Sequence, residues 1–119
     1  MESILTSIKK MLGIDADYTH FDAELIMHIN SVFMTLHQLG VGPSEGYTIS
    51  DSYGSWSDFL PEDRQLEAVK TYMGMKVRLI FDPPTSAATL QAMERQVSEW
   101  EWRLNVAVDP APTEIVVTN

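Results

Sequence analysis

The chain has 119 residues, a formal net charge of −9 and no cysteine. A chain of this length folds as one domain that buries roughly two-thirds of its unfolded surface. The lack of cysteine excludes a disulfide framework and a thiolate metal site. The first residues carry no signal-like apolar run, and no stretch approaches the ~20 apolar residues of a membrane span, so we expect a soluble protein that is cytoplasmic at synthesis.

The charges are unevenly distributed along the chain. No Lys or Arg occurs between Lys10 and Arg64, whereas nine Asp or Glu lie in that interval. A nucleic-acid-binding surface needs cations that displace the counterions of the phosphates. The sequence therefore argues against a protein that holds DNA or RNA.

Two amphipathic helices are predicted in the first third of the chain. Residues 2–12 form a short helix that Gly13 ends, and residues 20–39 form a long one that Gly40 ends. Thr19 followed by Asp22 resembles a capping box at the start of the long helix. On the far side from its apolar face are Met27 and Met34. Exposed methionines form adaptable contact surfaces, but single exposed apolar residues are also common, and both interpretations stay open.

The segment 41–60 changes in composition to Gly, Ser, Asp and aromatic residues. It is longer than most connections, and long irregular loops are commonly functional. Tyr47-Thr48-Ile49 has the composition of a short strand, which allows a short β-hairpin here. Two roles remain open for its apolar residues, namely contact with a partner or pinning of the loop to the helices. The candidates for partner contact are Tyr47, Ile49, Tyr53 and Trp56, and pinning is the alternative for Trp56 and Phe59.

The second half of the chain predicts a helical hairpin. A helix over residues 61–81 is apolar on two sides, with Leu66, Val69, Met73, Val77 and Ile80 on one side and Ala68, Tyr72, Met75 and Leu79 on the other. Asp82-Pro83-Pro84 ends it. A helix over 85–104, capped by Thr85 or Ser86, has one apolar stripe that should pack on the first. Trp102 lies off that stripe, either exposed by chance or as a partner contact, and Gly74 predicts the close approach of a neighbouring backbone.

The last fifteen residues, 105–119, have two prolines and no helical period, which predicts an extended tail. Three consecutive aliphatic residues favour a tail that adds to another chain as a strand or docks in a groove, with fraying as the alternative. The residues expected to make this contact are Pro110, Pro112, Ile115, Val116 and Val117.

No catalytic motif is recognisable in the chain. Asp15-x-Asp17 resembles the start of a calcium loop but lacks the glycine and the distal Glu at the required spacing. Glu24 with His28, or His20 with Asp22, supplies two metal ligands, and two ligands do not make a site. We therefore expect no enzyme, no metal site and no cofactor.

These elements define an all-α fold, a small bundle of four helices over residues 1–104 with a long loop between the second and third helices and an extended C-terminal tail. The surplus apolar positions are candidates for contacts between subunits. They are Met27, Met34, Tyr72, Met75, Leu79 and Trp102.

Three stretches in fixed order, WSDFL, YMGMKVRLIFDPP and EWEWRL, resemble the head–tail connector, or head-completion adaptor, proteins of tailed bacteriophages. The start LTSIKKMLGID before a long helix is also similar to that family. The most specific parts are RLIFDPP at Arg78 to Pro84 and ERQVSEWEWRL at Glu94 to Leu104.

The resemblance implies a non-enzymatic virion protein that forms a ring, commonly twelve-fold, beneath the portal of the DNA-filled head. The ring would receive the tail or stopper protein, the tail segment from Asn105 to Asn119 would reach the portal, and DNA would pass without specific binding. It also implies assembly in the host cytoplasm and a final place at the head–tail interface, with no membrane contact. The alternative function is a small helical regulator that binds another protein without catalysis.

Overall fold

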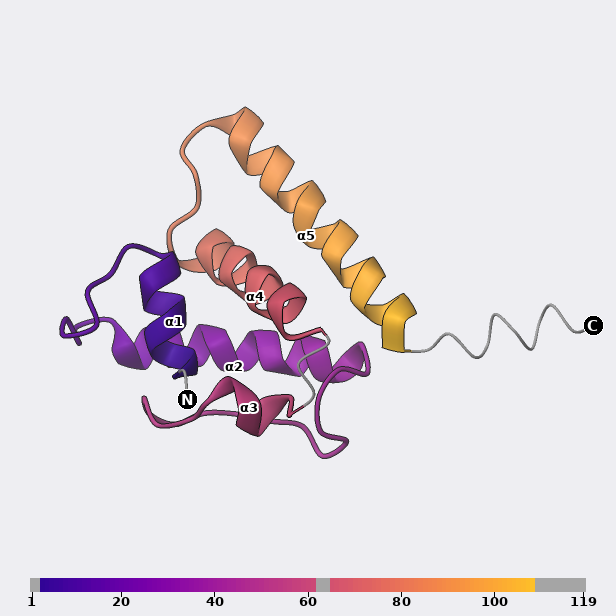
Figure 1. Ribbon diagram of the computed structural model, residues 1–119. Helices are drawn as coiled ribbons and strands as arrows, with labels where there is room; N and C mark the ends of the chain where they lie inside the picture. Colours follow the sequence, from indigo (N-terminus) through magenta and orange to yellow (C-terminus); the bar gives the residue numbers. More distant parts are fainter. Residues whose placement is uncertain (1–2, 62–64, 109–119) are drawn as a thin grey trace, which may run out of the picture.

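The computed structural model describes residues 3–61 and 65–108 of the chain, with side chains described to residue 106 (Figure 1). Within these ranges the fold is all-α, as predicted, with five helices instead of four. They are α1 (Ile4–Met11), α2 (Asp22–Gln38), α3 (Trp56–Phe59), α4 (Leu66–Phe81) and α5 (Ala87–Val108). None of the described helices is both long and apolar enough to cross a membrane.

Helix α4 is the centre of the molecule. It packs against α2 on one side and α5 on another, while α1 contacts both α2 and α4. Figure 1 shows α4 between α2 and α5, with α3 on the side of α2 away from α4. Val69, Tyr72, Met73 and Val77 of α4 are all 0% exposed, which fits a helix that is apolar on two sides. The core comes mainly from α1, α2 and α4, and Val97 and Leu104 extend it into α5.

A side chain caps the start of α1, whereas no side chain caps the start of α2. Ser3 caps α1, because its hydroxyl accepts a hydrogen bond from Thr6 N at 3.2 Å. The predicted capping box at Thr19 and Asp22 is wrong, since Phe21 is the N-cap of α2 and has no side-chain cap bond. Asp22 instead pairs with Lys9, whose Nζ lies 2.8 Å from Asp22 Oδ1.

The predicted hairpin of α4 and α5 is present. Val97 and Leu104 of α5 are 5% and 2% exposed and face α4, while Leu90, Met93 and Trp100 on the same stripe are partly buried. Ser86 is the residue that caps α5, with its Oγ 3.4 Å from Thr89 N. Helix α5 continues to Val108, so residues 105–108, predicted as part of the tail, are helical.

The loop between α2 and α4 contains no strand in its described residues, so the short β-hairpin that its sequence allows is not formed there. An isolated bridge pairs Ser3 with Ser55, and the short helix α3 follows. A capping box of Ser55 and Asp58 fixes the start of α3. The side chain of Asn30 holds the middle of the loop, because it accepts from Ile49 N at 2.8 Å and donates to Ile49 O at 2.9 Å. The loop is thus attached to both α1 and α2.

Candidate interaction surfaces

Tyr72, predicted as a subunit contact, lies in the interior of the chain. Its side chain is 0% exposed, and its hydroxyl donates to Glu101 Oε2 at 2.8 Å. Burial, and then the hydrogen bond and negative charge of Glu101, hold the pKa of Tyr72 far above its ordinary value of 10.0. Because α5 covers this side of α4, the prediction of an interface at Tyr72 is wrong.

The aromatic residues of the loop divide between pinning and exposure. Trp56 is 2% exposed and its Nε1 donates to Ser7 Oγ at 2.7 Å, so it pins the loop to α1. Ile49 is also buried, and partner contact was the wrong role for both residues. Tyr47 is half-buried against Phe33 and Phe59, and burial, followed by the charge of Asp58, raises its pKa. Tyr53 is 87% exposed and is the loop residue that remains available to a partner.

Helix α2 has an exposed apolar stripe on the side opposite its buried face. Met27 and Met34 are 68% and 65% exposed and lie two turns apart. Ser31 lies between them. Its hydroxyl donates to His28 O at 2.7 Å, so its hydrogen is already bonded within the helix. We call Met27, Ser31 and Met34 the α2 stripe.

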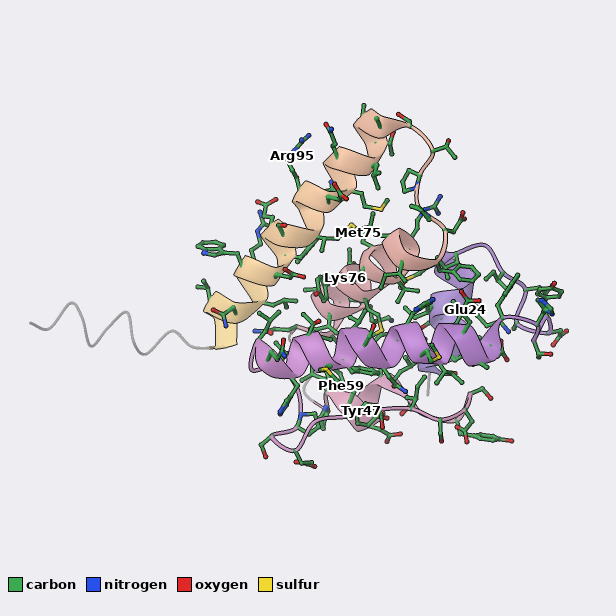
Figure 2. All side chains as sticks on the ribbon, turned by 180° about the vertical axis from the view of Figure 1, so that it is seen from behind. Glu24, Tyr47, Phe59, Met75, Lys76 and Arg95 are labelled. Atoms are coloured by element: carbon green, nitrogen blue, oxygen red, sulfur yellow. The ribbon has the colours of Figure 1, made fainter. Side chains whose placement is uncertain are left out.

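Helix α5 has a second exposed stripe. Trp102 and Val106 are 67% and 44% exposed on the side turned away from α4. Arg95, two turns before Trp102, points away from the bundle (Figure 2). Glu99 pairs with Arg103 at 2.9 Å, and both side chains are more than half exposed. We call Arg95, Trp102 and Val106, with Glu99 at their edge, the α5 stripe.

A groove of about 320 Å³ lies on α4 beside the end of α1. It is lined by Met11, Thr71, Gly74, Met75 and Arg78. Gly74 makes room for a side chain and not for the backbone predicted, since a Cβ there would lie 2.5 Å from Met11 Sδ. Arg78 Nε is buried and has no hydrogen-bond partner in the described part of the chain. We call this hollow the α1–α4 groove.

The sequence does not reveal this groove, because Met11 falls on the apolar face of its helix although its side chain is 43% exposed. The glycine inside α4 was the signal that could have found it. Of the other predicted interface residues, Met75 lines the groove and Leu79 is partly buried on the same helix.

The candidate metal-ligand pairs make ordinary contacts within a helix or a turn. His28 Nε2 lies 3.4 Å from Glu24 Oε2 as a pair one turn apart on α2. His20 packs against the ring of Phe21, and Asp15 Oδ1 accepts from Asp17 N at 2.9 Å in a turn. In the ranges 3–61 and 65–108, no three His, Asp or Glu side chains are grouped as a metal site requires. The predicted tail contacts, Pro110, Pro112, Ile115, Val116 and Val117, lie outside the described residues.

In its described residues the chain is a small all-α protein with exposed apolar stripes on two helices and a groove on a third. The model of one family, described as phage connector protein, matches residues 4–111 and therefore covers all five helices. The chain belongs to the phage connector protein family, which is a structural family, and a connector role in a phage follows. No curated protein and no solved structure matches it.

Proposed function

We propose that this chain is a structural virion protein that forms an oligomeric ring between the phage portal and the tail or stopper protein. The ring completes the DNA-filled head. The observation that carries this proposal is the family match over residues 4–111, since it spans the whole helical domain. The subunits assemble in the host cytoplasm and end at the head–tail interface of the virion.

The exposed apolar residues favour an oligomer. Met27 and Met34 on α2 and Trp102 on α5 are each about two-thirds exposed, which leaves apolar surface for other subunits to cover. Met75 and Leu79 add partly exposed surface on α4. A closed ring needs head-to-tail contact between two different surfaces of each subunit, and these residues lie on three helices. Twelve copies are the number that the connector role suggests.

We assign portal docking to the predicted tail, of which residues 105–108 belong to α5. Its two prolines are poor helix formers, and its aliphatic run suits addition as a strand or docking in a groove of the portal. The tail residues that would make the contact are Pro110, Pro112, Ile115, Val116 and Val117. The exposed Tyr53 on the long loop is proposed to face a neighbour or the next ring.

The net charge of −9 suits a channel through which DNA slides. A basic wall would retain DNA by releasing counterions, whereas an acidic wall repels it. Retention of DNA by the purified protein at moderate salt would contradict this part of the proposal.

Assembly on heads tests the function as a whole. The purified chain is added to portal-bearing heads that lack it, and the particles are imaged. The proposal predicts density at the single portal vertex and recovery of tail attachment. A monomer that ignores the heads would instead favour a protein-binding regulator.

A further inference from the structure

We propose that the α1–α4 groove of one subunit receives Trp102 of the neighbouring subunit, with Glu99 of that neighbour pairing with Arg78. This inference rests on the proposed ring and specifies which two surfaces meet in it. The partner is a second copy of this chain. The indole of Trp102 fills the groove, and the carboxylate of Glu99 reaches the guanidinium of Arg78.

The groove has the volume and the lining to accept one large apolar side chain. Its volume is about 320 Å³, which exceeds that of a single aromatic side chain. Two of its lining residues are Met11 and Met75, whose unbranched thioethers adapt to the shape of a partner and contact aromatic rings favourably. Gly74 lets the end of Met11 lie against α4 as one wall of the groove, because any Cβ there would collide with Met11 Sδ.

Arg78 gives the groove its chemical preference. Its guanidinium is the cationic group in the lining of the groove, and no hydrogen bond within the described residues occupies its Nε. A carboxylate is the strongest acceptor for a guanidinium. We therefore expect the groove to bind an apolar side chain that has an acidic side chain beside it.

The α5 stripe brings these two groups together. Trp102 is 67% exposed on the side of α5 away from the hairpin seam, so it cannot enter the groove of its own chain. Glu99 lies one turn earlier on the same helix, and its pair with Arg103 is an exposed one that can be exchanged at little cost. Tryptophan seated in a pocket with arginine nearby is the typical composition of an interface hot spot.

A competing receptor is the hollow beside Met34, between α2 and the long loop. Its volume is about 210 Å³, and its described lining includes the carboxylate of Glu45 and the imidazole of His37 but no Lys or Arg. That carboxylate would repel Glu99, whereas Arg78 would attract it. The charges of the two hollows therefore favour the α1–α4 groove.

Cross-linking of cysteine variants distinguishes the two receptors, because the natural chain has no cysteine. Ser98→Cys lies one turn before Trp102, Thr71→Cys lines the groove and Ser31→Cys lies in the α2 stripe, and all three positions are exposed. Each conservative variant keeps Trp102 and Arg78 intact. The chains are purified separately, mixed in pairs, assembled on portal-bearing heads and treated with a short bismaleimide.

A covalent dimer from the Ser98→Cys and Thr71→Cys mixture, with none from either chain alone, is the expected result. A dimer from the Ser98→Cys and Ser31→Cys mixture in its place would overturn the inference. The inference would also be overturned if the heads carry the protein but no cross-link forms between the Ser98→Cys and Thr71→Cys chains. If the wild-type chain never associates with heads, both the inference and the proposed function fail.

Assembly strength gives a second measurement. Trp102→Ala should raise the protein concentration needed to occupy half of the heads at least tenfold, because a seated tryptophan is a hot spot. Arg78→Met should raise it as well. Tyr18→Ala is the control and should change this concentration little, because Tyr18 is 50% exposed and lies in none of the proposed contacts. Unchanged occupancy with Trp102→Ala, beside normal occupancy by the wild type, would overturn the inference and leave the ring in place.

Discussion

The hydroxyl of Tyr72 on α4 and the carboxylate of Glu101 on α5 form a hydrogen bond of 2.8 Å inside the helical hairpin. Lys76 Nζ donates to the same carboxylate oxygen at 3.0 Å. Because a buried donor needs its acceptor at one position along the neighbouring helix, this group fixes how α5 lies along α4. The hairpin in turn holds the α5 stripe at a fixed place on the molecule.

Tyr72→Phe should destabilise the fold by about 1–3 kcal/mol, the usual cost of a lost hydrogen bond to a charged group. Its effect should depend on pH. Because folding raises the pKa of Tyr72, the stabilisation is present below pH 10.0, the ordinary pKa, and is lost as pH rises above it. Urea unfolding from pH 8 to alkaline pH should therefore show a shallower decline for Tyr72→Phe than for the wild type. The exposed Tyr53→Phe is the control, and an equal change in both variants would refute the role of burial.

Trp56→Phe should lower the free energy of unfolding by about 2–3 kcal/mol. The change leaves a small cavity and removes the donor to Ser7 Oγ, which links the loop to α1 across the core. Trp102→Phe, at a position 67% exposed, is the matched control and should change stability by less than about 0.5 kcal/mol. Thermal unfolding followed by circular dichroism checks both, and similar melting temperatures for the two variants would show that the loop is not held through Trp56.

Lys9→Met should destabilise the fold by about 3 kcal/mol, whereas Lys10→Met should have little effect. Lys9 is 2% exposed, pairs with Asp22 and donates to Ala16 O at 3.0 Å, while Lys10 is exposed. Removing one partner of a buried ion pair leaves the other charge uncompensated. Chemical denaturation of the two variants side by side measures the difference. Equal stabilities would mean that the pair between α1 and α2 contributes nothing.

Deletion of residues 111–119 should leave folding unchanged and abolish docking to the portal. Within the described residues the hydrophobic core runs from Ile4 to Leu104, so the truncated chain keeps these core contacts. The measurements are a melting curve and the fraction of heads that bind the protein. Replacing Ile115, Val116 and Val117 by serine in the full-length chain is the matched control for length. A truncated chain that still completes heads would refute the proposed role of the tail.

The helices were largely predictable because each carries its own periodic pattern. The Val97 and Leu104 stripe predicted the hairpin correctly, since a stripe on one helix needs a complementary face and the preceding helix supplied one. The short helix α3 was missed, although Ser55 and Asp58 have the spacing of a capping box, because four residues are too few to show a period.

The contacts between distant segments were not predictable in the same way. The pattern of the first helix does not indicate that Lys9 is buried, because its partner Asp22 lies thirteen residues later in the chain. Tyr72 was expected on a free face because nothing in its own helix indicates that Glu101 covers it. The groove at Gly74 and Arg78 likewise depends on where Met11 lies, which the pattern of either helix alone does not determine.

The most direct test of the central claim is the mass of the particle that the chain forms. Native mass spectrometry of the purified protein, together with imaging of heads incubated with and without it, gives the copy number and the binding site. We predict a closed ring, of twelve copies on the portal, with density at one vertex of each head. A monomer in solution that also leaves the portal vertex unchanged would contradict the proposed ring.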